Sequence, residues 1–337
     1  MATMKDVAKA AGVSTATVSA SLSGASFVSP ILQARVAKAI EVLGYERNSM
    51  ASGLKRGKTA LIGLIVSDIT NPFFTELVHC VQKKAWQAGY SVLLGISDHD
   101  SGREAELLRL MRSHQAEGTI LCPAGGIEDY QPHCLKIGRM KLVAVDNAAP
   151  DMPFDTIALD NHKAAGLAVR HILSFGHRRV AAMAGHAHQL VSRQRLDGFR
   201  DAMVAENVAV DPARIRHGDF RIEDAYRSCG ELLSLQLRPT ALFVANNLML
   251  IGVMRALAEA GIAVPGDMSV ASIDDFPWAS AFQPALTVVR QPIADMATLA
   301  FDRLIERMKG DDSPRSHTLC DPQLIIRQSC APPRVAE

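Results

Sequence analysis

The sequence predicts a small all-α head containing a helix-turn-helix unit, followed by a larger α/β body of two doubly wound lobes, each built on a parallel sheet. Three observations predict this fold class: two short helical patterns joined by a glycine near the N-terminus, a basic segment after residue 46, and strand–helix units that repeat from residue 60 onward. The chain of 337 residues is long enough for two or three lobes, and its 48% hydrophobic and 21% charged residues are typical of globular proteins.

The head begins with a short amphipathic helix. Its apolar residues Met4, Val7, Ala8 and Ala11 recur at the i, i+3, i+4, i+7 spacing of one helix face. Gly12 would end this helix at a tight corner, where the backbone needs a residue that tolerates positive φ. Ala8 and Ala11 are small, which lets a second helix cross closely.

A second short helix is expected over residues 15–22. Ser14 is a candidate N-cap, Val18 and Leu22 would point inward, and Gly24 would end the helix. Two short helices joined by a glycine turn form a helix-turn-helix unit, whose second helix enters the major groove of DNA. An ordinary helical hairpin is the alternative interpretation.

A third helix, over residues 31–43, would complete the head. Ser29 and Pro30 provide a cap followed by the proline preferred in the first turn, and Gly44 provides the stop. Three helices within fewer than fifty residues can close a small core of their own.

The head is basic although the whole chain is nearly neutral. Residues 1–58 contain eight Lys and Arg against three Asp and Glu, a net charge of +5, whereas the whole chain carries +1. The rest of the chain therefore sums to −4. A basic head on a mildly acidic body is typical of a protein whose head alone contacts DNA phosphates, and a chance imbalance in a short segment is the alternative.

The segment RNSMASGLKRGKT, residues 47–59, joins the head to the body. Gly53 and Gly57 weaken it as a helix, and a helix of about nine residues is marginal alone in water. Such a segment can be disordered when free and helical when DNA and a symmetry-related copy hold it. A flexible linker is the alternative.

From residue 60 onward, continuous apolar runs alternate with helical patterns. Strands are expected at 60–67, 90–96, 118–122, 142–145, 156–159, 179–183, 240–244, 268–273 and 286–289. Helices are expected at 74–87, 103–114, 162–175, 195–204, 225–235 and 248–260. Unalternating apolar strands separated by helices predict parallel sheets covered on both faces. In such folds the ligand lies beyond the carboxyl ends of the strands, often between two lobes.

Several classes of protein are disfavoured. No apolar run approaches the roughly 18 residues of a membrane span, and the N-terminus lacks the apolar core of a secretory signal. The six cysteines are scattered without a C-x-x-C pair, which predicts thiols in a reducing compartment. No nucleophile elbow, P-loop or dinucleotide-binding glycine motif is present. We therefore expect a cytoplasmic protein that does not span a membrane and has no catalytic residues, metal or cofactor.

The chain resembles the lactose repressor family (LacI/GalR type) over essentially its whole length. The motifs that carry the resemblance are, in chain order, KDVAKAAGVSTATVS, VAKAIEVLGY, RNSMASGLKRGKT, IGLIVSDITNPFF, FGHRRVAAMAG, RQRLDGF, LFVANNLML, SIDDF and PALTVVRQP. The resemblance implies a dimeric, or even tetrameric, transcription regulator whose body is similar to a periplasmic sugar-binding protein.

The resemblance also implies three parts of the chain. These are a helix-turn-helix DNA-binding domain (1–46), a hinge helix or linker (47–58) and an effector-binding and dimerisation domain (59–337). Within the last, the N-lobe would span about 60–160 and 292–320, and the C-lobe about 161–291 and 321–330.

The resemblance places six residues of the second helix at the DNA: Ser14, Thr15, Ala16, Thr17, Ser19 and Ala20. Thr15, Ala16 and Ala20 would face base edges, where Thr and Ala can contact a thymine methyl group. The other three, with the helix N-terminus, would contact phosphates or cap the helix.

Four hinge residues are expected at the DNA on the same basis: Asn48, Ala51, Leu54 and Lys55. Leu54 would insert into the minor groove, one copy per subunit, and kink the duplex by unstacking a base step. Arg47 and Ser52 stand where the family usually has Pro and Arg, which puts one phosphate or packing contact in doubt. Leu54 as an ordinary dimer-packing residue is the alternative.

Eight residues are expected to bind the effector by the resemblance: Phe73, Asp146, Gln189, Arg195, Phe220, Asn247, Asp274 and Trp278. The charged and amide side chains can bind hydroxyl groups, while Phe73, Phe220 or Trp278 stacks on a ring face. Asn247 replaces the usual aspartate, and Asn147 replaces a frequent arginine. Both replacements change the pattern of ligand groups that would fit.

These features imply a ligand-responsive, sequence-specific DNA-binding transcriptional regulator, a repressor of carbohydrate or sugar-acid metabolism genes. It would bind a pseudo-palindromic double-stranded operator as a homodimer, and effector binding between the lobes would control the ordering of the hinge. The expected effector is a sugar, sugar acid or similar polar metabolite rather than a purine. Whether it releases the DNA as an inducer or promotes DNA binding as a co-repressor stays open. The alternative is a solute-binding protein of the periplasmic type without DNA regulation, which would lack the basic head.

Overall fold

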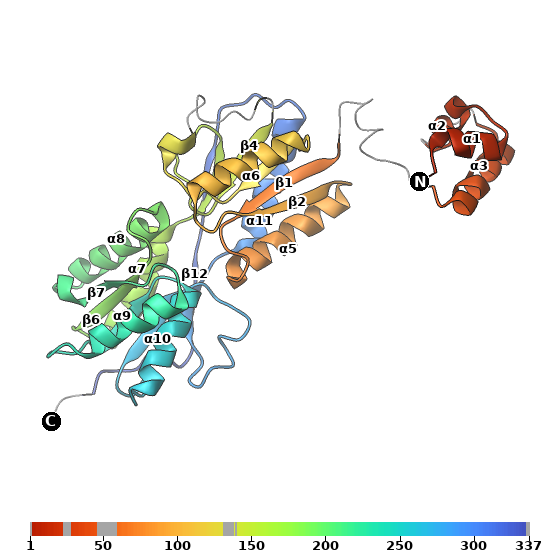
Figure 1. Ribbon diagram of the computed structural model, residues 1–337. Coiled ribbons are helices and arrows are strands. Elements are labelled where there is room, and N and C mark those ends of the chain that lie inside the picture. The colour runs from red at the N-terminus through yellow and green to blue at the C-terminus, as the bar shows by residue number, and fades with distance from the viewer. Residues whose placement is uncertain (1, 23–27, 46–58, 131–137, 139, 335–337) are drawn as a thin grey trace. The chain divides into compact units, whose positions relative to one another are not determined.

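The computed structural model describes residues 2–22, 28–45, 59–130, 138 and 140–334. The chain divides into two compact units, Met1–Thr59 (the head) and Ala60–Glu337 (the body), shown in Figure 1. Each unit has a hydrophobic core of its own.

The head contains the three predicted helices, α1 (Met4–Ala11), α2 (Thr15–Leu22) and α3 (Pro30–Leu43). A capping box begins α1: the Thr3 hydroxyl accepts from the Asp6 amide, and the Asp6 carboxylate accepts from the Thr3 amide at 2.8 Å. Gly12 ends α1 with φ of 62°, as its position at the corner predicts. The core of the head consists of Val7, Ala8, Ala11, Val18, Val36 and Ala39.

The first lobe of the body (the N-lobe) is a six-stranded sheet in the order β11-β5-β4-β3-β1-β2, and every pairing in it is parallel. Its strands are β1 (Leu61–Val66), β2 (Ser91–Ile96), β3 (Gly118–Leu121), β4 (Lys141–Val145), β5 (Asp155–Leu159) and β11 (His317–Cys320).

Helices cover both faces of the N-lobe sheet. Helices α5 (Pro72–Gln87) and α11 (Ile293–Met308) pack on the face that carries Leu64, while α6 (Ser101–Ser113) packs on the face that carries Ile65. Neighbouring residues of β1 therefore belong to two different cores, which explains why this strand is apolar throughout.

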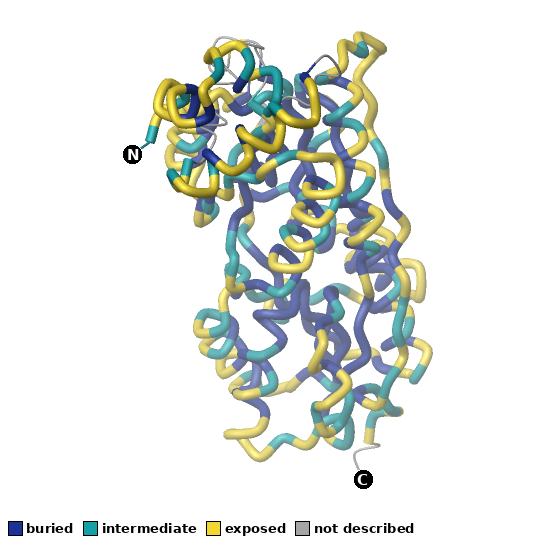
Figure 2. Tube along the Cα trace, turned by 90° about the vertical axis from the view of Figure 1, so that its right-hand side faces the viewer, coloured by how far each residue is buried: buried dark blue, intermediate teal, exposed yellow. Residues whose placement is uncertain are grey.

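The second lobe (the C-lobe) is a six-stranded sheet in the order β12-β10-β9-β8-β6-β7, parallel except for the β10–β12 pair. Its strands are β6 (Val180–Ala184), β7 (Ile215–His217), β8 (Ala241–Val244), β9 (Ser269–Ile273), β10 (Thr287–Arg290) and β12 (Gln323–Ile325). In Figure 2 the interiors of both lobes are buried, and the exposed residues follow the outer helices and loops.

Four helices pack in two pairs on the C-lobe sheet: α7 (Asn161–Ser174) with α8 (Leu190–Ala205), and α9 (Ile222–Leu233) with α10 (Asn247–Glu259). A glycine permits each close crossing. A Cβ on Gly198 would lie 2.3 Å from the His162 carbonyl oxygen, and a Cβ on Gly252 would lie 2.1 Å from the Ile222 carbonyl oxygen.

The chain passes between the lobes three times: from β5 to α7, from β10 to α11 and from β11 to β12. The two-lobed α/β fold class is therefore confirmed, with three connections that can act as a hinge. None of the described helices is both long and apolar enough to cross a membrane.

The sequence prediction missed four elements of the body. Three are the short edge strands β7, β11 and β12, whose residues are largely exposed or half-buried and so form no continuous apolar run. The fourth is α11, whose first residue follows β10 after a two-residue connection. In addition, α8 begins at Leu190, five residues before the predicted start.

Candidate functional site

A small cavity lies between the two lobes, beyond the carboxyl ends of the central strands. It has a volume of about 40 Å³, enough for about three water molecules. The residues that line it are Asp68, Asn71, Phe73, Phe74, His99, Asp146, Gln189, Val191, Arg195, Phe220, Asn246, Asp274 and Gln291. The structure thus brings together six of the eight residues predicted for effector binding, and places them where doubly wound sheets bind ligands.

Two carboxylates of this cavity come from different lobes. Asp146 follows β4 and is half-buried, whereas Asp274 follows β9 and is buried. Burial raises the pKa of Asp146 to about 7; Arg195 opposes this shift and Asp274 adds to it. Burial also raises the pKa of Asp274, against the opposing effects of Arg195 and of a hydrogen bond from Gln291.

Arg195 on α8 supplies the positive charge of the site. Its Nε donates to the Asn161 side-chain oxygen at 2.8 Å and its Nη1 donates to the Ala245 carbonyl at 2.5 Å, while Nη1 lies 3.9 Å from the Asp274 carboxylate. The guanidinium is therefore fixed by neutral acceptors before any ligand enters. This preorganisation lowers the entropic cost of binding.

The cavity contains more negative than positive groups. Asp68, Asp146 and Asp274 face one guanidinium, that of Arg195. Even with one buried carboxyl protonated near neutral pH, the described lining carries no net positive charge. Such a site favours neutral molecules that bring hydrogen-bond donors, because carboxylates only accept hydrogen bonds.

Aromatic rings form the apolar part of the cavity. Phe73 and Phe74, in the first turn of α5, contact each other edge to face with ring centroids 4.9 Å apart. Phe220 precedes α9 with φ of 58°, and its ring lies so close to Gly185 that a Cβ there would be 2.1 Å from it. Gly185 therefore lets the Phe220 ring lie over the end of β6.

Trp278 was predicted to bind the effector, but it does not line this cavity. Its side chain is 47% exposed and packs edge to face on Phe276, with centroids 5.4 Å apart. It follows Asp274 by four residues, and the intervening turn carries it to the surface of the body. The aromatic rings that line the cavity are those of Phe73, Phe74 and Phe220.

Asn247 is buried, but it holds the lobes together and does not line the cavity. Its Nδ2 donates across the lobes to the Asn71 side-chain oxygen at 3.0 Å, and its own side-chain oxygen accepts from the Leu248 amide. Asn71 in turn caps α5, accepting from the Phe73 amide at 2.9 Å. The neighbouring Asn246 lines the cavity instead.

Asn147 forms a second contact between the lobes. Its side-chain oxygen accepts from the Val191 amide at 3.3 Å and its Nδ2 donates to the Pro123 carbonyl at 2.9 Å. The asparagine that stands where the family often has arginine is thus occupied with backbone groups of both lobes. Gln189, the buried N-cap residue of α8, also reaches across the cleft to His99.

Seven lining residues are not among the predicted effector-binding residues: Asp68, Asn71, Phe74, His99, Val191, Asn246 and Gln291. Four of them, Asp68, His99, Asn246 and Gln291, lie within three residues of the carboxyl end of a strand (β1, β2, β8 or β10). Applying the rule for parallel sheets to every strand end would have found these four.

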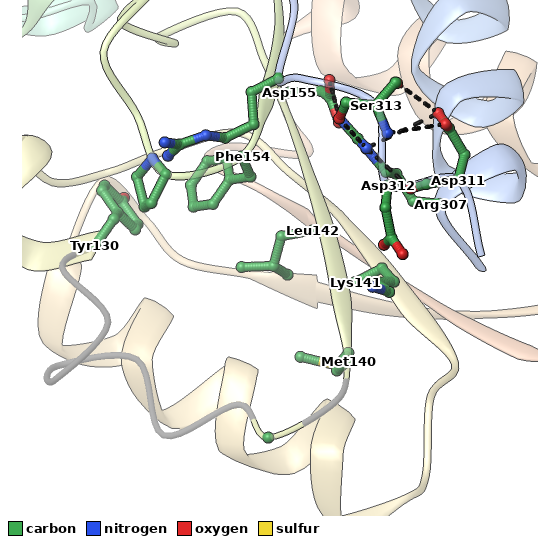
Figure 3. Close-up of a pocket in the computed structure, with 13 residues that line it drawn as sticks. Tyr130, Met140, Lys141, Leu142, Phe154, Asp155, Arg307, Asp311, Asp312 and Ser313 are labelled. Atoms are coloured by element: carbon green, nitrogen blue, oxygen red, sulfur yellow. Dashed lines mark hydrogen bonds and ion pairs between the residues drawn. The ribbon is translucent and has the colours of Figure 1, made fainter. Parts of the chain in front are cut away.

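A second cavity lies elsewhere in the N-lobe and has a volume of about 440 Å³ (Figure 3). It lies at the amino ends of β4 and β5, where Arg307 donates to the buried Asp155 carboxylate at 2.7 Å. Asp155 also accepts from Ser316, so its charge is satisfied by the protein itself. This ion pair anchors the end of α11 to the sheet.

In the head, the predicted DNA-contacting residues of α2 divide into two groups. Ser14 accepts from the Thr17 amide at 3.1 Å and shares a hydrogen bond with the Thr17 hydroxyl at 2.9 Å, so the predicted cap is confirmed. Thr15, Ala16 and Ser19 are exposed, and Ala20 is half-buried. The hinge predictions Asn48, Ala51, Leu54 and Lys55 lie outside the described residues.

Comparison with known proteins identifies both units. Residues 3–48 match the family described as bacterial regulatory proteins, lacI family, and residues 169–330 match the periplasmic binding protein-like domain. The chain is 32% identical over 330 residues to a protein of Photobacterium profundum named HTH-type transcriptional repressor PurR, with 98% of each chain covered. It is also 32% identical over 334 residues to the repressor of that name in Haemophilus influenzae (strain PittEE), again with 98% of each chain covered.

Solved structures give the same result. The lac repressor dimer bound to operator and the anti-inducer ONPF is 26% identical, with a TM-score of 0.88 over 98% of this chain and 99% of that one. The transcriptional regulator CelR in complex with cellobiose is also 26% identical, with a TM-score of 0.72 over 98% of this chain and 100% of that one. These relatives are transcription regulators and not enzymes. The chain therefore belongs to the lacI family of bacterial regulatory proteins, and it is a ligand-responsive, DNA-binding transcriptional repressor.

Proposed function

We propose that the effector of this repressor is a neutral ring compound rich in hydrogen-bond donors, bound between the lobes at Asp146, Arg195 and Asp274. The observation that carries this proposal is the excess of carboxylates over guanidinium groups in the cavity. A sugar acid, one of the effectors expected from the sequence, would bring a further negative charge into this site. The charge of the cavity therefore favours a neutral effector over a sugar acid.

A purine base is the first candidate. The relatives from Photobacterium and Haemophilus are repressors named PurR, which favours a purine-related effector over the sugar expected from the sequence. The ring N–H groups of a purine can donate to the Asp146 and Asp274 carboxylates, and its flat face suits the phenylalanines of the cavity.

A neutral sugar is the second candidate. The similar regulator CelR was solved with cellobiose, and sugar hydroxyls also donate to carboxylates while an aromatic ring packs on the apolar face of the sugar. The cavity of about 40 Å³ is smaller than either candidate, so both require the lobes to move apart before the ligand enters.

On the DNA side, we propose that the chain binds a pseudo-palindromic operator as a homodimer in the cytoplasm, where the chromosome lies. The helix-turn-helix domain (1–46) would read bases through Thr15, Ala16 and Ala20, and Leu54 of the hinge (47–58) would enter the minor groove. Movement of the lobes within the effector-binding part (59–337) would change the separation of the two hinge segments. A coupling of about 1–3 kcal/mol is enough to change operator affinity 5- to 150-fold.

A thermal-shift screen of the full-length protein tests the effector proposal. The panel should contain purine bases, purine nucleosides, neutral mono- and disaccharides, and sugar acids at equal concentration. A bound effector raises Tm by mass action. We expect a neutral compound to raise Tm and the sugar acids to leave it unchanged; a shift by sugar acids alone would contradict the charge argument.

A further inference from the structure

Three histidines gather at the cleft between the lobes, beside the effector cavity. His99 belongs to the N-lobe and follows β2, whereas His186 and His188 belong to the C-lobe and follow β6. The ring centroids of His99 and His186 are 5.9 Å apart, and those of His186 and His188 are 5.3 Å apart. The His99–His186 contact therefore exists only while the lobes are together.

Hydrogen bonds assign protons to two of these rings. Gln189 Nε2 lies 3.1 Å from His99 Nδ1, and an amide that donates there requires this nitrogen to be unprotonated. His186 Nδ1 lies 3.2 Å from the Asp219 carboxylate, to which it donates. This arrangement leaves His99 a neutral imidazole in the closed cleft.

The charged groups around the cluster come from every neighbouring element. Asp68 follows β1, Asp98 precedes His99 and is paired with Arg103 of α6, and Asp219, Arg221 and Asp224 lie between β7 and the first turns of α9. Asp68 and Asp98 favour a protonated His99, while His186 and Arg221 oppose it. Asp219 and Asp224 favour a protonated His186, while His188 and Arg221 oppose it.

Burial has the largest effect on the pKa of His99. Loss of water around the ring, with the neighbouring His186, lowers the pKa of His99 to about 4. Burial also lowers the pKa of His186, although Asp219 opposes the shift. Among the described residues, no group of three or more His, Cys, Asp and Glu side chains is placed to hold a metal ion.

We propose that His99 and His186 form a proton-sensitive latch, which holds the lobes closed while both rings are neutral and releases them when His99 takes up a proton. Protonation removes the acceptor that Gln189 uses and puts a positive charge beside His186 and Arg221. This property depends only on lobe closure, so it holds whichever effector the repressor binds.

The direction of the pH dependence follows from linkage. A His99 exposed in the open cleft would titrate near its ordinary pKa of 6.5, and in the closed cleft near 4. Between these values the open form binds more protons, so acidification through this window favours opening. The contribution of His99 to the closing equilibrium should fall about tenfold between pH 7.5 and pH 5.5.

Asp146 has the opposite effect on the pH dependence of closure. Its carboxyl gains a proton when the cleft closes around it, so acidification favours the closed form. The latch must therefore be tested against a variant that leaves Asp146 unchanged. His99→Asn is suitable, because its side-chain oxygen can accept from Gln189 but cannot take up a proton in this pH range. The ratio of wild type to His99→Asn then isolates His99, since the Asp146 effect is common to both.

Hydrogen–deuterium exchange of the full-length, ligand-free protein can measure the closing equilibrium. The Val191 amide donates across the lobes to Asn147, so the peptide that contains it reports opening of the cleft. After correction for the intrinsic pH dependence of exchange, we expect its protection in the wild type, relative to His99→Asn, to fall about tenfold from pH 7.5 to pH 5.5. A peptide from the buried strand β8 serves as the control and should not change.

Other outcomes would overturn the latch. Equal pH dependence in the wild type and His99→Asn would show that His99 does not control the cleft. A difference abolished by EDTA and restored by Zn²⁺ would assign the cluster to a metal. His186→Asn provides a second variant and should reduce the pH effect, because it removes a group that opposes protonation of His99; an unchanged or larger effect would refute the pairing.

Discussion

Asp146 and Asp274 occupy equivalent positions in the two lobes and meet at the same cavity. Each is the first residue after a central strand, and each has positive φ, 73° and 75° respectively. Each amide also donates to the adjacent strand of its own sheet, to Ile157 from Asp146 and to Val289 from Asp274. Two copies of one local geometry thus place a carboxylate from each lobe at the cavity between them.

Asp274→Asn should weaken binding of the compound found in the thermal-shift screen about tenfold to hundredfold. A hydrogen bond to a charged group contributes about 1.5–3 kcal/mol, and the amide keeps the shape of the side chain while removing the charge. Isothermal titration calorimetry measures the change. Asp302→Asn, whose side chain is 54% exposed and pairs with Lys84 on the outside of the N-lobe, is the matched control and should bind normally.

The stability of the body should depend on pH through Asp146. Its pKa rises from 3.8 to about 7 on folding, so the folded protein holds an extra proton between these pH values. The free energy of unfolding should therefore fall as the pH rises from 4 to 7, by up to about 4 kcal/mol. Urea unfolding of the wild type and Asp146→Asn at pH 5 and pH 8 checks this. A stability difference between the two proteins that is independent of pH would contradict it.

Phe220→Ala should weaken effector binding, whereas Trp278→Ala should leave it within about twofold. The Phe220 ring lines the cavity and the Trp278 ring lies at the surface. Removing an aromatic ring that stacks on a ligand costs about 0.5–1.5 kcal/mol beyond its buried area. Calorimetry with the same compound distinguishes the two variants. Equal losses of affinity would show that Trp278 also contributes to effector binding.

Gly252→Ala should destabilise the C-lobe by about 1–3 kcal/mol. The added Cβ would meet the backbone oxygen of Ile222 at 2.1 Å, so α9 and α10 would have to move apart. Gly230→Ala on α9 is the control, because no atom lies within 4 Å of its added Cβ. That control should stabilise the protein by about 0.5–1 kcal/mol, as expected for glycine to alanine within a helix. Denaturant unfolding measures both changes, and similar values for the two would refute the close-packing argument.

Leu54→Ala should reduce affinity for a selected operator much more than affinity for random duplex DNA. A wedge inserted into the minor groove contributes only where the duplex is kinked, whereas phosphate contacts act on any sequence. Binding of both DNAs should also weaken steeply with salt. Leu237→Ala, which changes a 64% exposed leucine of the body, is the control. Equal losses of affinity for the two DNAs would indicate that Leu54 is a packing residue and not a wedge.

Much of the fold could be predicted because it depends on local pattern. The glycine at the end of α1, the serine cap of α2 and the apolar strands of both sheets are each specified by residues within one or two turns of chain. The strands β7, β11 and β12 were not predicted because their own sequences contain no continuous apolar run. They are extended because they pair with β6, β5 and β10 respectively.

The candidate site was only partly predictable, for the same reason. Arg195 and Asp274 could be placed because they stand in the motifs RQRLDGF and SIDDF, and Asp146 because it follows a predicted strand. His99 stands in no such motif, and it reaches the cavity only because two separate sheets bring their strand ends together. Trp278 follows the SIDDF motif by two residues, yet the turn after Asp274 directs its ring to solvent.

By itself, the sequence determined the helix-turn-helix head and the alternation of strands and helices, since both are encoded in spacing along the chain, and its motifs carried the resemblance to the family. Only the tertiary structure decided which side chains share the cleft, that Asn247 joins the lobes instead of lining the cavity, and that His99 meets His186 across them. These facts depend on contacts between residues 87 to 176 positions apart, and packing of the two lobes, not local pattern, sets such contacts.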